Sequence, residues 1–150
     1  MSTLKEQLYI LCATYLRNRE TDIKSAIAAA QEAANEDTKS SAGDKFETGR
    51  ESVQQEIDLN LVRLNELNKM KTALELIIPA QKGSIAAPGS LVFTNNGIFY
   101  VAISAGQLKV DGATYIAISA ASPIGTNFMG QTAGYEFSFN GKKYKIEKVV

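Results

Sequence analysis

Carboxylates gather in a small, polar stretch that runs from Asn35 to Phe46 and separates two long patterns of helical period. Asp37 and Asp44 lie on opposite sides of its centre, which is rich in Ser, Ala and Gly and therefore favours a turn. Carboxylate oxygens are the ligands that Mg²⁺ takes, usually one or two from a protein while it keeps several waters. The pair could supply such ligands. The local sequence alone favours a solvated loop that exposes Glu36 and Asp37 and in which Asp44 caps the second helix.

Composition excludes several other kinds of site. The chain has no His and one Cys, so zinc sites of mixed Cys/His type and nucleophiles activated by His are excluded. Cys12 has no second Cys for an intramolecular disulfide, which favours a reducing location, and its helical surroundings indicate a buried small side chain. No apolar run reaches the roughly 18 residues that span a bilayer, and the first residues lack the layout of a signal peptide. We therefore expect a soluble, cytoplasmic protein without a membrane partner.

Charge is divided unevenly along the chain. There are 16 basic and 16 acidic residues, but residues 1–79 carry 10 basic and 13 acidic ones, whereas residues 80–150 carry 6 and 3. The acidic excess of the first part gathers around the polar stretch, which indicates a tip that meets something positive, such as a metal ion or a basic channel. Four lysines near the end of the chain could form an electropositive patch or simply a solvated strand face: Lys142, Lys143, Lys145 and Lys148.

Two helices are predicted, one on each side of the polar stretch. The first begins with an apolar stripe from Leu4 to Tyr15. Because the pattern then falters, we expect a kink or short break near residues 17–21 before the stripe resumes at Ile23. Residues 26–34 are mostly Ala, and such small side chains let two helices approach closely. They favour a slim hairpin, although a helix packed in any bundle would also use them.

The second helix is predicted over residues 45–77, and Pro79 ends it. Its apolar side chains keep to one broad face: Phe46, Val53, Ile57, Leu61, Leu64, Leu67, Leu74 and Ile78. Such a helix is about 50 Å long at 1.5 Å per residue, more than the core of so short a chain can cover. Gly49 is expected to loosen its start. We therefore expect residues 1–79 to form an antiparallel coiled-coil hairpin with an acidic tip at residues 35–47.

A second domain follows a linker at residues 80–89. Beyond it the period changes from helical to alternating, with Asn-Gly and Asp-Gly turns. Strands are expected at residues 90–94, 98–103, 113–119, 135–139 and 143–149. Ser122 and Pro123 open a short helix that runs toward Met129. The prediction is an α+β protein, in which the hairpin is followed by a small antiparallel β-sheet domain with one short helix at residues 90–150.

Taken together, these features resemble the Gre family of bacterial transcript-cleavage factors. In the N-terminal part the similarity rests on the Leu-Lys-Glu-Gln-Leu segment at residues 4–8, on the expected break at Arg19-Glu20, and on Ile23 followed by the run from Ala26 to Ala30. In the C-terminal part it rests on Ser122-Pro123-Ile124-Gly125, Met129-Gly130, Gly134 and the closing Tyr144-Lys145-Ile146. The spacing of this second set is the strongest single match. It implies that residues 90–150 adopt the FKBP-like fold of the family's C-terminal domain.

The resemblance also implies a function. In the Gre family the coiled coil enters the secondary channel of RNA polymerase. Its acidic tip helps to hold a catalytic Mg²⁺, so that the polymerase's own active site hydrolyses backtracked RNA. Carried onto this chain, the catalytic acids are Asp37 and Asp44, with Glu36 and Glu47 as further metal ligands. The C-terminal domain docks at the rim of the channel, and the candidate partner-binding residues are Ser122, Pro123, Ile124 and Gly125.

On this interpretation the chain is not an enzyme by itself. It would bind RNA polymerase in the bacterial cytoplasm and would contact nascent RNA only within that complex. The Mg²⁺ would be shared with the polymerase active site rather than held stably by the chain alone. No small-molecule substrate is expected.

The tip departs from the family's pattern, because it is longer and its second acid has no clear counterpart. Two alternatives therefore stay open. The first is a non-cleaving regulator that occupies the secondary channel and competes with cleavage factors. The second is a chaperone or prolyl isomerase, suggested by an FKBP-like domain alone. That activity needs an open aromatic pocket.

Overall fold

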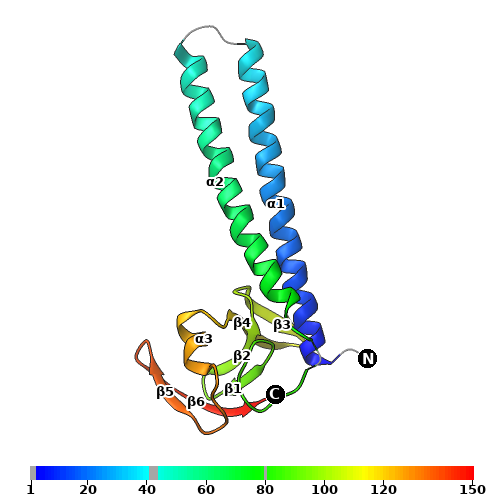
Figure 1. Cartoon of the computed structure of the whole chain (residues 1–150), viewed down its shortest axis with the longest axis vertical. Helices are drawn as coiled ribbons and strands as arrows, with labels where there is room; N and C mark the ends of the chain where they lie inside the picture. Colours follow the sequence, from blue (N-terminus) through cyan, green and yellow to red (C-terminus); the bar gives the residue numbers. More distant parts are fainter. Residues whose placement is uncertain (1–2, 41–43, 80) are drawn as a thin grey trace. The chain divides into compact units, whose positions relative to one another are not determined.

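Two long helices and a six-stranded sheet make up most of the chain (Figure 1). The computed structural model describes residues 3–40, 44–79 and 81–150, and the side chains of these residues except within 37–48. The chain divides into two compact units. We call Leu16–Met70 the hairpin unit, and the combination of Met1–Tyr15 with Lys71–Val150 the sheet unit. The α+β class predicted from the sequence is confirmed.

Helix α1 spans Leu4–Ser40, and helix α2 spans Asp44–Glu75. Both extend further into the polar stretch than the sequence indicated. Gly49 lies inside α2, so the helix continues through it in spite of the low helix propensity of glycine. In the parts of the chain that the structure describes, no helix is both long and apolar enough to cross a membrane.

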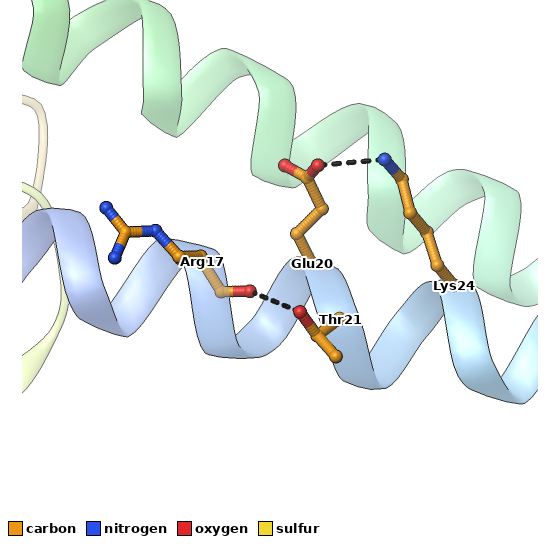
Figure 2. Close-up of polar contacts among 4 residues, drawn as sticks. All are labelled: Arg17, Glu20, Thr21 and Lys24. Carbon is orange, nitrogen blue, oxygen red and sulfur yellow. Dashed lines mark hydrogen bonds and ion pairs between the residues drawn. The ribbon is translucent and has the colours of Figure 1, made fainter.

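The predicted break at residues 17–21 is wrong, because α1 is continuous there. Figure 2 shows two contacts between residues four apart within this continuous segment. The Thr21 hydroxyl donates to the carbonyl oxygen of Arg17, one turn earlier, at 3.1 Å, and the Lys24 ammonium lies 2.9 Å from the Glu20 carboxylate. An ion pair of a Glu with a Lys four residues later stabilises a helix surface. The polar residues at 17–21 therefore lie on the surface of a continuous helix and do not mark its end.

Buried side chains in the hairpin unit follow a seven-residue spacing. On α1 they are Leu16, Ile23 and Ala30, and on α2 they are Asn60 and Leu67. This heptad spacing is the pattern of a coiled-coil seam, in which each helix covers the other. The small side chain of Ala30, only 5% exposed, is consistent with the slim hairpin that the Ala-rich run predicts.

The seam differs from the predicted apolar face at one position on α2. Leu61 was expected inside and is 49% exposed, whereas Asn60 is 4% exposed. Buried positions on α2 advance by seven residues from Asn60 to Leu67, and Leu61 lies about 100° further round the helix. Ile78, also expected on this face, lies beyond the end of α2 and is 62% exposed. A polar residue therefore replaces leucine in the seam.

The sheet has the strand order β3-β4-β2-β1-β6-β5. Its strands are β1 Leu91–Thr94, β2 Gly97–Ala102, β3 Gly106–Val110, β4 Ala113–Ser119, β5 Glu136–Phe139 and β6 Lys142–Val149. The short helix α3 spans Pro123–Phe128, as predicted. Strands β3 and β5 form the two edges of the sheet.

The sheet is mixed, whereas the sequence analysis predicted a wholly antiparallel sheet. β2 and β4 pair in parallel, with Phe99 opposite Ile116, and the other pairs are antiparallel. The reason is β3, a strand that the sequence analysis did not predict. It forms a hairpin with β4 around Asp111 and Gly112, whose φ angles of +50° and +82° suit a tight two-residue turn. This hairpin brings β4 back alongside β2 in the same direction as β2.

One face of the sheet packs against α3 around a core of large apolar side chains. The buried members are Ala86, Val92, Phe99, Val101, Ile118, Phe128 and Ile146. Several aromatic residues complete this core, with the rings of Phe99 and Phe128 centred 5.1 Å apart and those of Phe137 and Tyr144 stacked at 5.2 Å. The aromatic side chains are therefore packed against one another.

The opposite face carries Tyr100, which alternates with the core residues of β2 and is fully buried. Leu8 and Cys12 of α1 are fully buried in the same unit. Burial, together with the nearby Cys12 and Tyr9, raises the pKa of Tyr100. Burial raises the pKa of the Cys12 thiol to about 12, so this cysteine is an unreactive core residue, as predicted.

Lys5 fastens the start of α1 to two other segments of the sheet unit. Its side chain is 7% exposed, and its ammonium group donates hydrogen bonds to the carbonyl oxygens of Gln81 and Val150. Burial lowers the pKa of this lysine. The linker and the end of β6 are thereby joined to α1 through one side chain.

Candidate functional site

The four acids predicted at the tip lie where α1 ends and α2 begins. The backbones of Glu36 and Asp37 belong to α1, which ends at Ser40, and those of Asp44 and Glu47 belong to the first turn of α2. The side chain of Glu36 is exposed. The side chains of Asp37, Asp44 and Glu47 fall outside those that the structure describes, so the predicted ligand set stays a prediction.

The two pairs of acids lie at helix ends of opposite polarity. The carbonyl end of a helix is negative and the amide end is positive, so an acid is worth about 0.3–1 kcal/mol at the start of a helix and is unfavourable near its end. Asp44 and Glu47 therefore suit α2. Glu36 and Asp37, within five residues of the end of α1, are at the unfavourable end. Helix stability thus accounts for the second pair of acids but not for the first.

The donor set fits a hard cation. All four predicted ligands are carboxylates, which Mg²⁺ prefers, and the chain contains no histidine. Elsewhere, among the residues with described side chains, no group of three or more Cys, Asp or Glu could hold a metal ion.

A basic hollow lies on the flank of the hairpin unit, and the sequence analysis missed it. It has a volume of about 390 Å³ and is lined by Arg19, Asp22, Ile23, Ala26, Asn60 and Arg63. Its floor includes the buried Asn60, whose amide donates to the Glu56 carbonyl oxygen at 3.0 Å. The oxygen of that amide accepts a hydrogen bond from the Arg63 guanidinium at 3.4 Å. The signal that could have revealed this hollow is the polar Asn60 at a seam position.

The two arginines that line this hollow are side chains of the kind that bind anions. Arg19 and Arg63 come from different helices and meet at one hollow, and guanidinium groups favour phosphate and carboxylate oxygens. Asp22 on the same wall reduces the net positive charge. A single phosphate group or the backbone of a nucleic acid is the kind of ligand that this arrangement suits.

The motif Ser122-Pro123-Ile124-Gly125 forms the tight corner between β4 and α3. The Ser122 hydroxyl accepts a hydrogen bond from the amide of Gly125 at 3.0 Å and donates to the carbonyl oxygen of Ser119 at 2.7 Å. Pro123 is at the start of the helix, where its missing N–H is not needed. A Cβ on Gly125 would lie 2.1 Å from the Ser119 oxygen, so only glycine fits.

This geometry explains most of the motif by folding. Ser122 caps α3, Gly125 allows the close approach, and Ile124 packs against the core of the sheet unit. Pro123 is exposed and remains available to a partner. The predicted partner-binding role of these four residues is therefore a prediction that rests mainly on Pro123 and the surface around it.

No protein-family model matches the chain, and no curated protein is similar enough to it to indicate a common origin.

Proposed function

We propose that the chain is a Gre-type elongation factor that binds RNA polymerase, places the end of its hairpin in the secondary channel and stimulates cleavage of backtracked RNA. The observation that carries this proposal is the position of Glu36 and Asp37 near the end of α1, where acids are unfavourable for the helix. A cost in stability at the far end of a long two-helix hairpin is explained if these acids act on something positive outside the chain.

The chemistry follows from the donor set. When bound, Mg²⁺ polarises a phosphoryl oxygen and activates a water for attack. The part of this chain is to offer carboxylate oxygens from the ends of two helices. Asp37 and Asp44 are the proposed catalytic residues, and Glu36 and Glu47 are further ligands. The hydrolytic site itself belongs to the polymerase, so the chain acts as an accessory factor rather than as an enzyme.

Two further features support the proposal. The coiled-coil seam includes Ala30, whose small side chain lets two helices approach closely, as a hairpin that enters a channel would need. The hollow with Arg19 and Arg63 offers guanidinium groups to phosphates, which suits contact with RNA inside the polymerase complex. Exposed Pro123 beside α3 is the proposed point of contact with the rim of the channel.

A second candidate function keeps the polymerase and drops the chemistry. A factor of this kind occupies the channel and competes with cleavage factors without stimulating cleavage. The observation that favours it is the tip sequence, in which six residues separate Asp37 from Asp44 and no adjacent pair of acids follows the turn. It requires binding that tolerates the loss of these acids.

The prolyl isomerase alternative has less support. Phe99 and Phe128 are 4% and 0% exposed, and Phe137 stacks on Tyr144. These aromatic residues fill the core beside α3 instead of lining an open pocket for a proline ring.

A stalled, backtracked elongation complex with labelled RNA tests the proposal. The chain, added with Mg²⁺, is expected to release short 3′ fragments. Asp37→Ala and Asp44→Ala are each expected to abolish this release. Asp58→Ala is the matched control: it removes an acid from the exposed face of α2 and is expected to retain full activity.

Each other outcome changes the proposal in a defined way. If no fragments form but the chain slows cleavage by an established Gre factor, it is the non-cleaving regulator. If it neither releases fragments nor competes, the proposal of a polymerase factor is wrong. Fragments that persist in both Asp variants would place the metal ligands elsewhere.

A further inference from the structure

A small hollow lies in the sheet unit, where the start of α1 meets the linker. It has a volume of about 170 Å³ and is lined by Lys5 of α1 and by residues 81–83, 85 and 87–90. All of these residues belong to the sheet unit. Pockets for drug-sized molecules have volumes of about 300–1,000 Å³, so this hollow has room for a single small group.

Lys5 brings a buried positive charge to this hollow. It is 7% exposed, and the part of it that reaches the linker is the ammonium group, which donates to the carbonyl oxygens of Gln81 and Val150. In the part of the chain with described side chains, no side-chain carboxylate lies within ion-pair distance of this ammonium group. An ammonium group has three N–H donors, so one is left for a further acceptor.

The buried charge of Lys5 is of the kind that ordinarily has a partner of opposite sign. An unpaired charge inside a protein loses its hydration without compensation, and carbonyl oxygens supply only partial negative charge. Burial lowers the pKa of Lys5, which means that its surroundings disfavour the charged form. An anion in the hollow would favour the charged form.

The other side chains that line the hollow suit the same kind of partner. Lys82 adds a second positive charge; it is exposed, and among the described side chains no carboxylate lies within ion-pair distance of its ammonium group. None of the described residues that line the hollow is an Asp or a Glu. The larger hollow with Arg19 and Arg63 differs in this respect, because Asp22 is part of its wall. The small hollow therefore combines two positive charges with no acidic side chain.

Backbone amides add further donors. Residues 82–85 lie outside any helix or strand, and their amides donate no hydrogen bond to another described residue. Residues 87–90 differ, since the Gly89 amide donates to the carbonyl oxygen of Val101 at 2.6 Å and the Ala87 amide donates to the Ser90 hydroxyl at 3.0 Å. One part of the wall is thus fixed to the sheet, and another part has amides that can bind a ligand.

We propose that this hollow binds a single phosphate group, held by the ammonium groups of Lys5 and Lys82 and by amides of the linker. A phosphate group carries a charge of about −1.5 to −2 at neutral pH, which matches two lysines better than the single charge of a carboxylate does. Lysine ammonium groups and backbone amides are both established donors to phosphate oxygens. The volume of the hollow suits a group of this size rather than a whole nucleotide.

This site is independent of the hairpin acids, because it lies wholly in the sheet unit. Its test uses the full chain without RNA polymerase and without Mg²⁺, so its failure and the failure of the proposed function are distinguishable.

Nuclear magnetic resonance of the isotope-labelled full chain locates the site. Sodium phosphate is added in one titration and sodium chloride, at the same ionic strength, in another. Phosphate is expected to shift the amide signals of residues 82–85 and the side-chain signals of Lys5, and these shifts are expected to saturate with one dissociation constant. Signals of residues 82–85 and Lys5 that move no further in phosphate than in chloride would overturn the proposal.

A matched pair of variants separates the hollow from net charge. Lys82→Gln removes one exposed charge from the hollow, and Lys109→Gln removes one exposed charge from elsewhere in the same unit. The first is expected to weaken phosphate binding about fivefold, as the loss of one exposed charge pair does, and the second to leave it unchanged. Equal effects of the two variants would overturn the proposal. The pair leaves Lys5 in place, because replacing Lys5 would also release the start of α1 from the linker.

Three probes decide the chemistry of the ligand. Inorganic phosphate and methyl phosphate are each compared with acetate in the same titration. Tighter binding of either phosphate compound than of acetate supports the proposal, and the tighter of the two shows whether the site takes free phosphate or a phosphate ester. Acetate that binds as tightly as both would overturn it. Circular dichroism of each variant checks that the fold is retained.

Discussion

The side-chain oxygen of Asn60 accepts a hydrogen bond from the guanidinium of Arg63 at 3.4 Å, within the seam of the hairpin. Asn60 is 4% exposed and occupies a position where a coiled coil normally buries an apolar residue. This hydrogen bond connects a buried residue of the seam to an arginine that lines the basic hollow.

Replacing Asn60 by leucine is expected to stabilise the hairpin unit. The change removes a polar group from a seam position beside Ile23, so we expect the free energy of unfolding to rise by about 1 kcal/mol. Thermal unfolding followed by circular dichroism at 222 nm, where helices absorb, measures this (the wavelength is a standard choice of about that value). Asn60→Ala is the matched control and is expected to lower stability. A less stable leucine variant would contradict the account of the seam.

Gly125→Ala is expected to destabilise the sheet unit. The new Cβ would meet the backbone oxygen of Ser119 at 2.1 Å, so we expect a loss of about 3 kcal/mol or more in the free energy of unfolding. Gly83→Ala is the control, because nothing lies within 4 Å of a Cβ at that position. Denaturant unfolding of both variants gives the comparison. Similar stabilities would show that the corner between β4 and α3 is not the reason for this glycine.

Tyr100→Phe is expected to leave the fold intact and to raise its stability. The Tyr100 hydroxyl is buried and, among the described residues, has no hydrogen-bond partner, and such a group costs about 1–3 kcal/mol. Removing it relieves part of that cost. Tyr115→Phe serves as the control, since the Tyr115 hydroxyl is not an unpaired buried group. Calorimetric unfolding of the two variants decides the point, and a large loss of stability in Tyr100→Phe would reveal a bond that this account lacks.

Stability is expected to fall at high pH because of Cys12. The folded-state pKa of about 12 lies above the ordinary value of 9.0, so the unfolded chain loses this proton first. The stability that the protonated Cys12 thiol contributes is fully present below pH 9 and is lost as the pH rises toward 12. Cys12→Ala removes it, so the decline from pH 9 to 10.5 should be shallower by about 1.4 kcal/mol per pH unit. If stability falls equally with pH in the unsubstituted chain and in Cys12→Ala, burial does not shield the thiol from solvent.

The sequence was sufficient to predict the helices, the class of fold and five of the strands, because their patterns are long or are bounded by clear turn residues. β3 was missed because Gly106–Val110 contains only two apolar residues that alternate. Its presence decides that β2 and β4 are parallel, which strand patterns alone do not reveal. The false break at residues 17–21 has a similar origin, since polar residues on a helix surface look like the end of a pattern.

The candidate functional residues also divide into those that the sequence revealed and those that only the structure revealed. The corner at Ser122 and Gly125 was identified from spacing, and the structure adds the reason for each residue. The basic hollow depends on residues of separate segments, with Asn60 of α2 beside Arg19 and Ile23 of α1. No local pattern contains such contacts. The role of the tip acids remains a prediction from the resemblance and from their positions at the helix ends.

The central claim is that the end of the hairpin reaches the active site of RNA polymerase. It is tested most directly by replacing the Mg²⁺ of that site with Fe²⁺ and generating hydroxyl radicals, which cut only protein close to the iron. We expect cuts in this chain confined to the acidic tip at residues 35–47, and loss of these cuts when unlabelled Gre factor is added in excess. Cuts in residues 90–150, or a bound chain that is not cut at all, would contradict it.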